Sequence, residues 1–273
     1  MPRYKLTIEY DGTGLLGWQR QPMGPSVQEI LETAVERFTG QFAFVQGAGR
    51  TDAGVHATAQ VAHVDLERDY RPYVVMSAIN HHVKPAAIAV TAAERVPEAF
   101  HARLSANHRA YLYRILNRRA PPAIERNHVW HVPVALDLDA MIAGAAHLVG
   151  HHDFTSFRAT ECQAKSPLKT LDRLAVSRVG DEIHVVPEAR SFLHHQVRNI
   201  VGTLKLVGAG QWQPDDVRRA LEARDRSAAG PTAPPDGLYL TRVGYPPEAM
   251  RAGAASAEQG RDLVDPDADD DVE

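Results

Sequence analysis

The stretch "YKLTIEY", residues 4–10, decides the first element of the fold. Its apolar and aromatic side chains alternate with polar ones, which is typical of a β-strand with one buried face. The next periodic stretch, "SVQEILETAVERFTG", residues 26–40, has the spacing of an amphipathic helix instead. It begins with a capping box, in which Glu29 follows Ser26 by three residues, and it ends at Gly40. A strand followed by a capped helix predicts a mixed α+β chain.

The rest of the first half adds two strands, a helix and a strand. They are expected at Phe42–Val45, Thr58–Leu66, Tyr70–His81 and Ile88–Val96. The resulting order, βαββαβ, is that of a ferredoxin-like fold.

The second half repeats this order without repeating the sequence. Its expected elements are a strand at Arg109–Asn117, a helix capped by Asp137, a hairpin turning at Gly180-Asp181, helices at Ser191–Val207 and Pro214–Ala223, and a final strand at Gly237–Tyr245. We therefore expect two ferredoxin-like halves, residues 1–105 and 106–247, joined through a mainly antiparallel sheet with a central cleft.

Composition narrows the class of protein. The chain has 273 residues, 44% of them hydrophobic, and a single cysteine, Cys162, so no internal disulfide can form. No apolar run approaches the length of a membrane span, and we expect a soluble, cytoplasmic protein.

Residues 248–273 form a distinct segment. They hold nine acidic and two basic residues and almost no bulky apolar ones, which is typical of a disordered acidic tail. The remaining residues carry 28 Lys and Arg against 25 Asp and Glu, a net charge of +3. This charge permits a polyanionic partner but does not require one.

The stretch "GRTDAG", residues 49–54, places one aspartate in a loop bounded by glycines. The glycines permit a close approach of a ligand to the backbone, and Arg50 would keep the carboxylate of Asp52 ionised. A lone ionised carboxylate suits nucleophilic attack better than two-carboxylate glycoside hydrolysis. The alternative for Asp52 is a purely structural role in a tight turn.

Two other kinds of site were weighed. Gly12, Gly14 and Gly17 match the dinucleotide-binding fingerprint, but that motif needs a helix immediately after it, and here the helix is delayed to about Ser26. A metal site would need three or four convergent ligands. The candidates His147, His151, His152 and Asp153, and the pair His194 and His195, have no further ligand pattern, and we expect no metal.

Aromatic and basic residues mark the second half. Tyr111 and Tyr113 share a strand face with Arg109, a combination that suits an unstacked base beside its phosphate, although structural tyrosines are equally common on sheets. Arg198 stands in an apolar helical run, where an arginine usually has a carboxylate partner.

Six blocks of the sequence closely resemble the TruA-type tRNA pseudouridine synthases. In chain order they are "YDGTGLLGWQRQ", "GRTDAGVHATAQVAH", "FHARLSANHRAYLYRI", "GHHDFTSF", "FLHHQVRNIVGTL" and "TAPPDGLYL", between Tyr10 and Tyr245. The second block is highly specific, whereas the first and last alone would be weak.

This resemblance implies an enzyme that converts uridines at positions 38, 39 and 40 of the tRNA anticodon stem-loop to pseudouridine, without cofactor or metal. It implies that Asp52 is the catalytic nucleophile and that Tyr111 contacts the target uracil. Basic residues of the family's active site fall on Arg50 and Arg198. It also implies a homodimer whose two subunits both contact the tRNA.

Three features depart from the family's usual pattern: Leu15 stands where an aromatic is common, Gln196 where a methionine is common, and the acidic tail is an addition. A rival of another class is a non-catalytic RNA-binding protein or RNA chaperone on the same fold, which would need the basic and aromatic residues but not Asp52.

Overall fold

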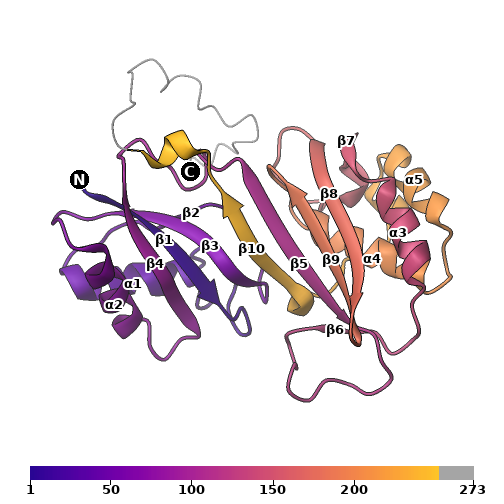
Figure 1. Ribbon diagram of the computed structural model, residues 1–273, viewed down its shortest axis with the longest axis horizontal. Coiled ribbons are helices and arrows are strands. Elements are labelled where there is room, and N and C mark those ends of the chain that lie inside the picture. Colours follow the sequence, from indigo (N-terminus) through magenta and orange to yellow (C-terminus); the bar gives the residue numbers. More distant parts are fainter. Residues whose placement is uncertain (252–273) are drawn as a thin grey trace. The chain divides into compact units, whose positions relative to one another are not determined.

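The computed structural model describes residues 1–251 and divides into two compact units (Figure 1). Unit 1 comprises residues 1–109 and 239–251, and unit 2 comprises residues 110–238. Most of the expected disordered tail, residues 252–273, lies outside the described residues. The helices and mainly antiparallel strand pairs of both units confirm the mixed α+β class.

Unit 1 combines a sheet with two helices. Strand β1 pairs antiparallel with β3 and β4, the short β2 pairs with β3, and β10 pairs with β3 in parallel. The strand order is therefore β4-β1-β3-β10. The elements are β1 (Arg3–Tyr10), α1 (Val27–Thr39), β2 (Gln46–Gly47), β3 (His56–Asp65), α2 (Pro72–His82), β4 (Ile88–Val96), β10 (Leu238–Gly244) and the 3-10 turn η4 (Pro247–Met250).

The first two expected elements form as the sequence indicates. Leu6 and Ile8 of β1 are completely buried, whereas the polar residues between them keep partial exposure. The Ser26 side chain accepts a hydrogen bond from the Glu29 backbone N–H and so caps α1. Gly40 ends the helix in the left-handed region, with φ +79°.

The last strand differs from the sequence-based division. It was assigned to residues 106–247 of the second half, but Tyr239–Arg251 belong to unit 1, because β10 pairs with β3 at Tyr239–His56 and Leu240–Ala57. The start of the acidic tail is also ordered. Ala249 and Met250 of η4 pack against a core cluster of unit 1 that includes Phe100.

Unit 2 has the strand order β5-β9-β8-β7, with β6 beside β5. The hairpin β8–β9 turns at Gly180, as expected. The elements are β5 (His108–Leu116), β6 (Trp130–His131), α3 (Leu138–Ala146), β7 (Gly150–Asp153), η1 (Thr155–Phe157), β8 (Leu168–Val179), β9 (Glu182–Ala189), α4 (Gln196–Gly208), α5 (Pro214–Ala223), η2 (Arg226–Ala228) and η3 (Pro235–Gly237).

Helix α4 begins later than the apolar pattern predicts. The pattern indicated a start at Ser191, but His195 has φ +61°, outside the helical region, and the helix begins at Gln196. The Gln196 side chain accepts a hydrogen bond from the Leu193 backbone N–H at 2.8 Å. Residues 191–195 therefore form a loop that leads into α4. No helix among residues 1–251 is long and apolar enough to cross a membrane.

A buried histidine gives unit 1 a pH-dependent stability. His63 of β3 accepts a hydrogen bond from the Ala102 backbone N–H at Nδ1, and its ring lies 4.9 Å from that of His101. Burial, with smaller contributions from Arg3 and His101, lowers the pKa of His63 from 6.5 to about 4. The pKa of His101 is lowered as well, again mainly by burial.

We predict that the unfolding free energy decreases as the pH falls from about 6.5 to about 4. In that range the unfolded chain binds a proton at position 63 that the folded chain does not, so stability is complete above the unfolded pKa and lost below it. The contribution of His63 is on the order of 3 kcal/mol, from the shift of the pKa to about 4. Urea denaturation of wild type and His63→Gln between pH 4 and 7 measures it. An equally steep pH dependence in the variant would contradict this assignment.

Candidate active site

Asp52 lies in the loop that connects β2 to β3 in unit 1. The backbone N–H of Val55 donates to the Asp52 carbonyl at 3.1 Å, which closes a tight turn with Gly54 at φ +79°. The Asp52 side chain is partly buried, and Arg50 is exposed. The loop thus presents a carboxylate and a guanidinium two residues apart, with neither fully withdrawn from solvent.

The stretch "DGTGLLG", residues 11–17, packs closely against this loop through its main chain at two glycines. A Cβ atom at Gly12 would lie 2.2 Å from the Val55 carbonyl oxygen, and one at Gly17 would lie 2.2 Å from that of Thr51. Both distances are far inside van der Waals contact, so only glycine fits. The first helix begins at Val27, ten residues after Gly17. The space beside these glycines is filled by the loop, which argues against a dinucleotide site.

Hydrogen bonds from the same segment fix both ends of the turn. The Trp18 N–H donates to the Thr51 carbonyl at 3.0 Å, and the Gly54 N–H donates to the Leu15 carbonyl at 3.2 Å. The hydroxyls of Tyr10 and Thr51 are 2.8 Å apart. The Leu15 contact uses the main chain, so it does not depend on the aromatic side chain that is common at this position.

The residues at the N-terminal end of the loop, Gly47 to Gly49, also have fixed contacts. The Gln60 side chain donates to the Gly49 carbonyl at 2.9 Å, and the Arg109 guanidinium donates to the Ala48 carbonyl at 2.6 Å. The Trp18 ring packs on Gly47, where a Cβ would lie 2.5 Å from a ring carbon. Arg109 is thereby a structural support of the loop in unit 1, a role that its position beside Tyr111 in the sequence did not reveal.

His56, the first residue of β3, holds the C-terminal end of the loop. Its Nδ1 accepts a hydrogen bond from the Gly12 backbone N–H at 3.0 Å, and its ring stacks on Tyr239 at 4.7 Å. Asp11 Oδ1 lies 3.1 Å from the same nitrogen. The Gly12 backbone and the Asp11 carboxylate thus both meet one nitrogen of the His56 ring.

In unit 2, the two tyrosines of β5 differ in their contacts and in their exposure to solvent. Tyr113 is completely buried and donates its hydroxyl to the Pro234 carbonyl at 2.7 Å, so it is structural. Burial raises its pKa well above the ordinary value. Tyr111 is 9% exposed and meets Phe192 edge to face, with ring centroids 5.2 Å apart. Tyr113 has an edge-to-face neighbour too, Trp130, with ring centroids 6.1 Å apart, so the two tyrosines differ in exposure and in the hydroxyl bond of Tyr113.

Arg198 in α4 is held by the segment that precedes β10. Its Nε donates to the Ala233 carbonyl at 2.8 Å, and the Ala233 N–H donates to the Arg198 carbonyl at 3.1 Å. Gln196, whose departure from the family pattern raised the question of how Arg198 is held, caps the start of α4 through Leu193 instead. The two bonds with Ala233 answer that question.

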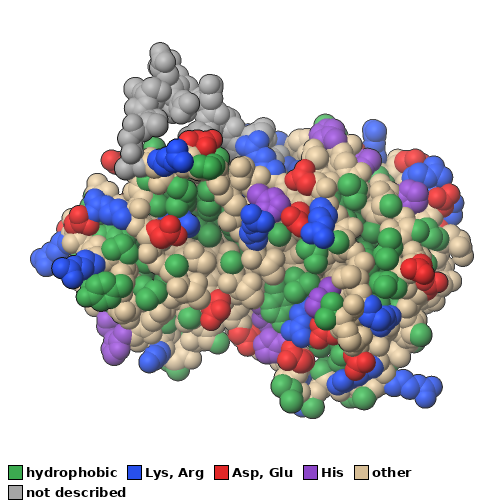
Figure 2. All heavy atoms as spheres, in the orientation of Figure 1, with side chains coloured by type: hydrophobic (Ala, Val, Ile, Leu, Met, Phe, Trp, Pro, Cys, Tyr) green, Lys and Arg blue, Asp and Glu red, His purple; other side chains and the backbone are tan. Residues whose placement is uncertain are grey.

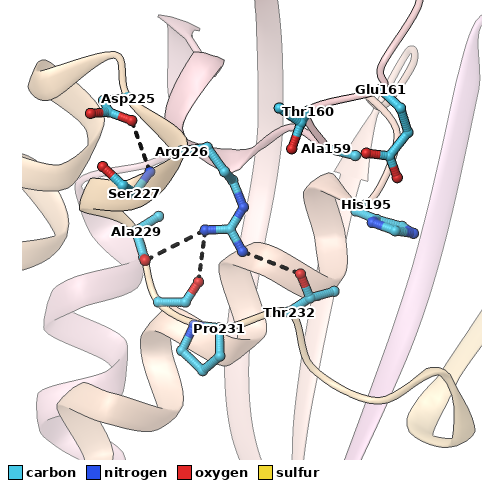
Figure 3. Close-up of a pocket in the computed structure, with 11 residues that line it drawn as sticks. Ala159, Thr160, Glu161, His195, Asp225, Arg226, Ser227, Ala229, Pro231 and Thr232 are labelled. Atoms are coloured by element: carbon cyan, nitrogen blue, oxygen red, sulfur yellow. Dashed lines mark hydrogen bonds between the residues drawn. The ribbon is translucent and has the colours of Figure 1, made fainter.

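Arg226 shapes the loop that carries Ala233 (Figure 3). It donates to the Gly230 carbonyl at 2.9 Å and to Thr232 Oγ1 at 3.2 Å. It also donates to Asn199 Oδ1 at 3.1 Å. The loop passes so close to α4 that a Cβ at Gly202 would lie 1.7 Å from the Pro231 carbonyl oxygen. A cavity of about 640 Å³ opens between this loop, His195 and residues 159–161. Arg226 is the one arginine that lines this cavity, and its guanidinium is hydrogen-bonded to the loop.

Three of the histidines considered as metal ligands have protein partners. His147 Nε2 lies 3.4 Å from Asp215, His151 Nδ1 lies 3.0 Å from the Thr170 hydroxyl, and His152 Nε2 lies 3.0 Å from the Val149 carbonyl. Within either unit taken alone, residues 1–251 bring no three His, Cys, Asp or Glu ligand atoms within 4.8 Å of one another.

The structure thus places Arg50 and Asp52 together in unit 1, and Tyr111 and Arg198 in unit 2. Sequence reasoning missed the supports of the loop, namely Tyr10, Thr51, Trp18, Gln60 and Arg109. The signal that could have found them is the glycine spacing of residues 12–17, which indicates a close backbone approach without saying what approaches.

The chain is similar to known proteins over nearly its whole length. A family model described as tRNA pseudouridine synthase matches residues 6–104 and 145–246. The chain belongs to the tRNA pseudouridine synthase family. Arg50, Asp52 and Arg198 lie in the matched segments, and Tyr111 lies between them.

Curated relatives agree with this membership. The chain is 64% identical over 253 residues to "tRNA pseudouridine synthase A" of Paramagnetospirillum magneticum, covering 93% of this chain and 99% of the relative. It is 64% identical over 245 residues to the protein of the same name in Caulobacter sp. strain K31, covering 90% and 98%. With the Rhodospirillum rubrum protein of that name it shares 59% identity, covering 95% and 92%.

Among solved structures, the "Crystal Structure of a Cbf5-Nop10-Gar1 Complex" matches 87% of this chain and 49% of that chain, about half its length. The identity is 12% and the TM-score 0.36, so this likeness carries no argument.

We predict that Gly17→Ala lowers turnover strongly and that Gly14→Ala does not. Both glycines have positive φ, +83° and +76°, so both variants bear similar backbone strain. A Cβ at Gly14 has no atom within 4 Å, whereas one at Gly17 would collide with Thr51 and displace the Asp52 loop. Thermal unfolding and single-turnover rates of the two variants separate strain from collision. Equal losses of turnover in both would show that the close approach does not matter.

Proposed function

We propose that this chain is a tRNA pseudouridine synthase that isomerises uridines at positions 38, 39 and 40 of the anticodon stem-loop, with Asp52 as the catalytic nucleophile. The observation that carries the proposal is the Asp52 loop, whose backbone is held on both sides of the aspartate in a chain of this family. Pre-positioned groups of this kind lower the barrier without reorganising during the reaction.

The reaction balances within the uridine itself. The bond between N1 and C1′ breaks, a bond between C5 and C1′ forms, the proton on C5 leaves and N1 gains a proton. No redox or group-carrier cofactor is required, and the proposal includes none and no metal. The target base must leave the stack to be reached.

The four site residues divide the work. Asp52 attacks the uridine, at a ribose or pyrimidine atom that the proposal leaves open. Tyr111, braced by Phe192, stacks on the uracil, and Arg50 and Arg198 neutralise phosphate and carboxylate charge. The proposal requires that Asp52 of unit 1 and Tyr111 and Arg198 of unit 2 reach the same uridine, in a cleft between two ferredoxin-like halves. The order β4-β1-β3 with β2 beside β3 supports a ferredoxin-like first half.

We predict that Asp52→Asn lowers turnover by several powers of ten and leaves RNA affinity nearly unchanged. The substitution keeps the side chain's size and removes its nucleophilicity, whereas phosphate contacts dominate affinity. Tritium release from C5 and equilibrium binding, on one stem-loop at fixed salt, measure the two effects. Asp172→Asn on β8, an exposed aspartate, is the matched control.

The same pair of measurements decides between the enzyme and the RNA-chaperone alternative. Tritium release at the wild-type rate in Asp52→Asn would sink the catalytic assignment and favour the chaperone. A joint collapse of binding and release would make Asp52 a structural residue of the loop.

We also propose a cytoplasmic homodimer whose subunits share one tRNA. The described residues carry 29 Lys and Arg and 26 Asp and Glu, a net charge of +3, and Figure 2 shows basic and acidic side chains intermixed on the face drawn. A polyanion as large as tRNA is held more strongly by two such surfaces than by one.

We predict that sedimentation at micromolar concentration gives twice the chain mass of 30.0 kDa. Association is expected because the proposed RNA contacts draw on both subunits. A monomer that is fully active at the same concentration would contradict the dimer and leave the assignment of Asp52 untouched.

A further inference from the structure

The hydroxyls of Tyr10 and Thr51 form a buried hydrogen bond next to the candidate nucleophile. The oxygen atoms are 2.8 Å apart, and the residues are 4% and 7% exposed. A buried hydroxyl without a partner would destabilise the fold, so each of these groups fixes the rotamer of the other. Tyr10 ends β1, the central strand between β3 and β4. The bond therefore ties the loop to a strand that is paired along both of its edges.

The main chain of Thr51 is tied to a second segment. Its carbonyl oxygen accepts a hydrogen bond from the Trp18 N–H at 3.0 Å and lies 2.2 Å from the position that a Cβ atom would take at Gly17. Trp18 is itself 3% exposed, and its ring lies 6.4 Å from that of Tyr10. Side chain and main chain of Thr51 are thus held by two different segments, which leaves the residue little freedom to rotate.

The other side of Asp52 is equally constrained. Val55 N–H closes the turn onto the Asp52 carbonyl, and Gly54 N–H donates to Leu15. Asp52 stands between an anchored Thr51 and an anchored turn, so its backbone direction follows from those of its neighbours. Loss of the Thr51 side-chain bond would leave Thr51 held through its main chain alone.

We propose that Tyr10, acting through the hydroxyl of Thr51, is a positioning residue that sets the direction of the Asp52 carboxylate. The inference rests on the proposed catalytic role of Asp52. It predicts a loss in the chemical step rather than in RNA binding, because a displacement of about 1 Å can cost a factor of about 100 in rate. Phosphate contacts elsewhere continue to carry affinity.

The test uses Tyr10→Phe and Thr51→Val, each of which removes one hydroxyl with little change of shape. Single-turnover tritium release at saturating enzyme is expected to slow by about 10- to 100-fold in both. The dissociation constant for the same stem-loop is expected to stay within about two-fold of wild type. Thr51→Ser retains the hydroxyl and is expected to restore most of the rate.

Tyr4→Phe is the matched control. Tyr4 lies at the other end of β1, is completely buried, and hydrogen-bonds through its hydroxyl to the Tyr70 carbonyl at 2.7 Å and to Asp69 at 3.0 Å. Tyr4→Phe also removes a hydroxyl with its hydrogen bonds from the same unit, so it reports any general effect of reduced stability. Its single-turnover rate is expected to match wild type.

A double-mutant cycle completes the test. Because Tyr10 and Thr51 share one bond, the variant lacking both hydroxyls is expected to be no slower than the slower single variant. Multiplicative losses, single variants within about two-fold of wild type, or an equal slowing by Tyr4→Phe would each overturn the inference. If Asp52→Asn also turns over at the wild-type rate, the proposed function fails. If Asp52→Asn is slow but Tyr10→Phe and Thr51→Val keep the wild-type rate, only the positioning role fails.

Discussion

The close approach of two backbone segments is the constraint on which the candidate site depends. The carbonyl oxygens of Thr51 and Val55 lie only 2.2 Å from the positions that a Cβ atom would take at Gly17 and Gly12, respectively. No other residue can stand at either glycine without moving the loop. Because both ends of the Asp52 turn are held by this contact, the backbone at the aspartate has little freedom to move. Pre-organisation of this kind is one way in which an enzyme lowers its barrier.

A second scaffold in unit 2 serves Arg198 in a similar way. Arg226 holds the loop that carries Ala233, and Ala233 in turn exchanges two hydrogen bonds with Arg198. Here too a glycine, Gly202, permits the loop to lie against the helix. Both units therefore place a charged side chain by packing one backbone segment closely against another at a glycine, with hydrogen bonds to main-chain carbonyls fixing the alignment.

Local elements could be predicted from the sequence because their signals are local. The alternation in residues 4–10 and the capping residues Ser26 and Gly40 act within a few positions, and the structure bears them out. The return of β10 to β3 could not be predicted, because that parallel pair joins residues about 180 positions apart and leaves no periodicity in either. The role of Gly12 and Gly17 was missed for a related reason. A glycine indicates that something comes close but not what comes close.

The central claim is that the Asp52 loop already has its working shape in the free protein and delivers its carboxylate to the target uridine. The most direct measurement is a crystal structure of the chain bound to an anticodon stem-loop whose target uridine cannot complete the reaction. The account predicts an unchanged backbone for residues 49–55 and an Asp52 carboxylate oxygen within about 3.5 Å of the ribose or pyrimidine atom under attack. A loop that rearranges on binding, or a carboxylate directed away from the uridine, would contradict it.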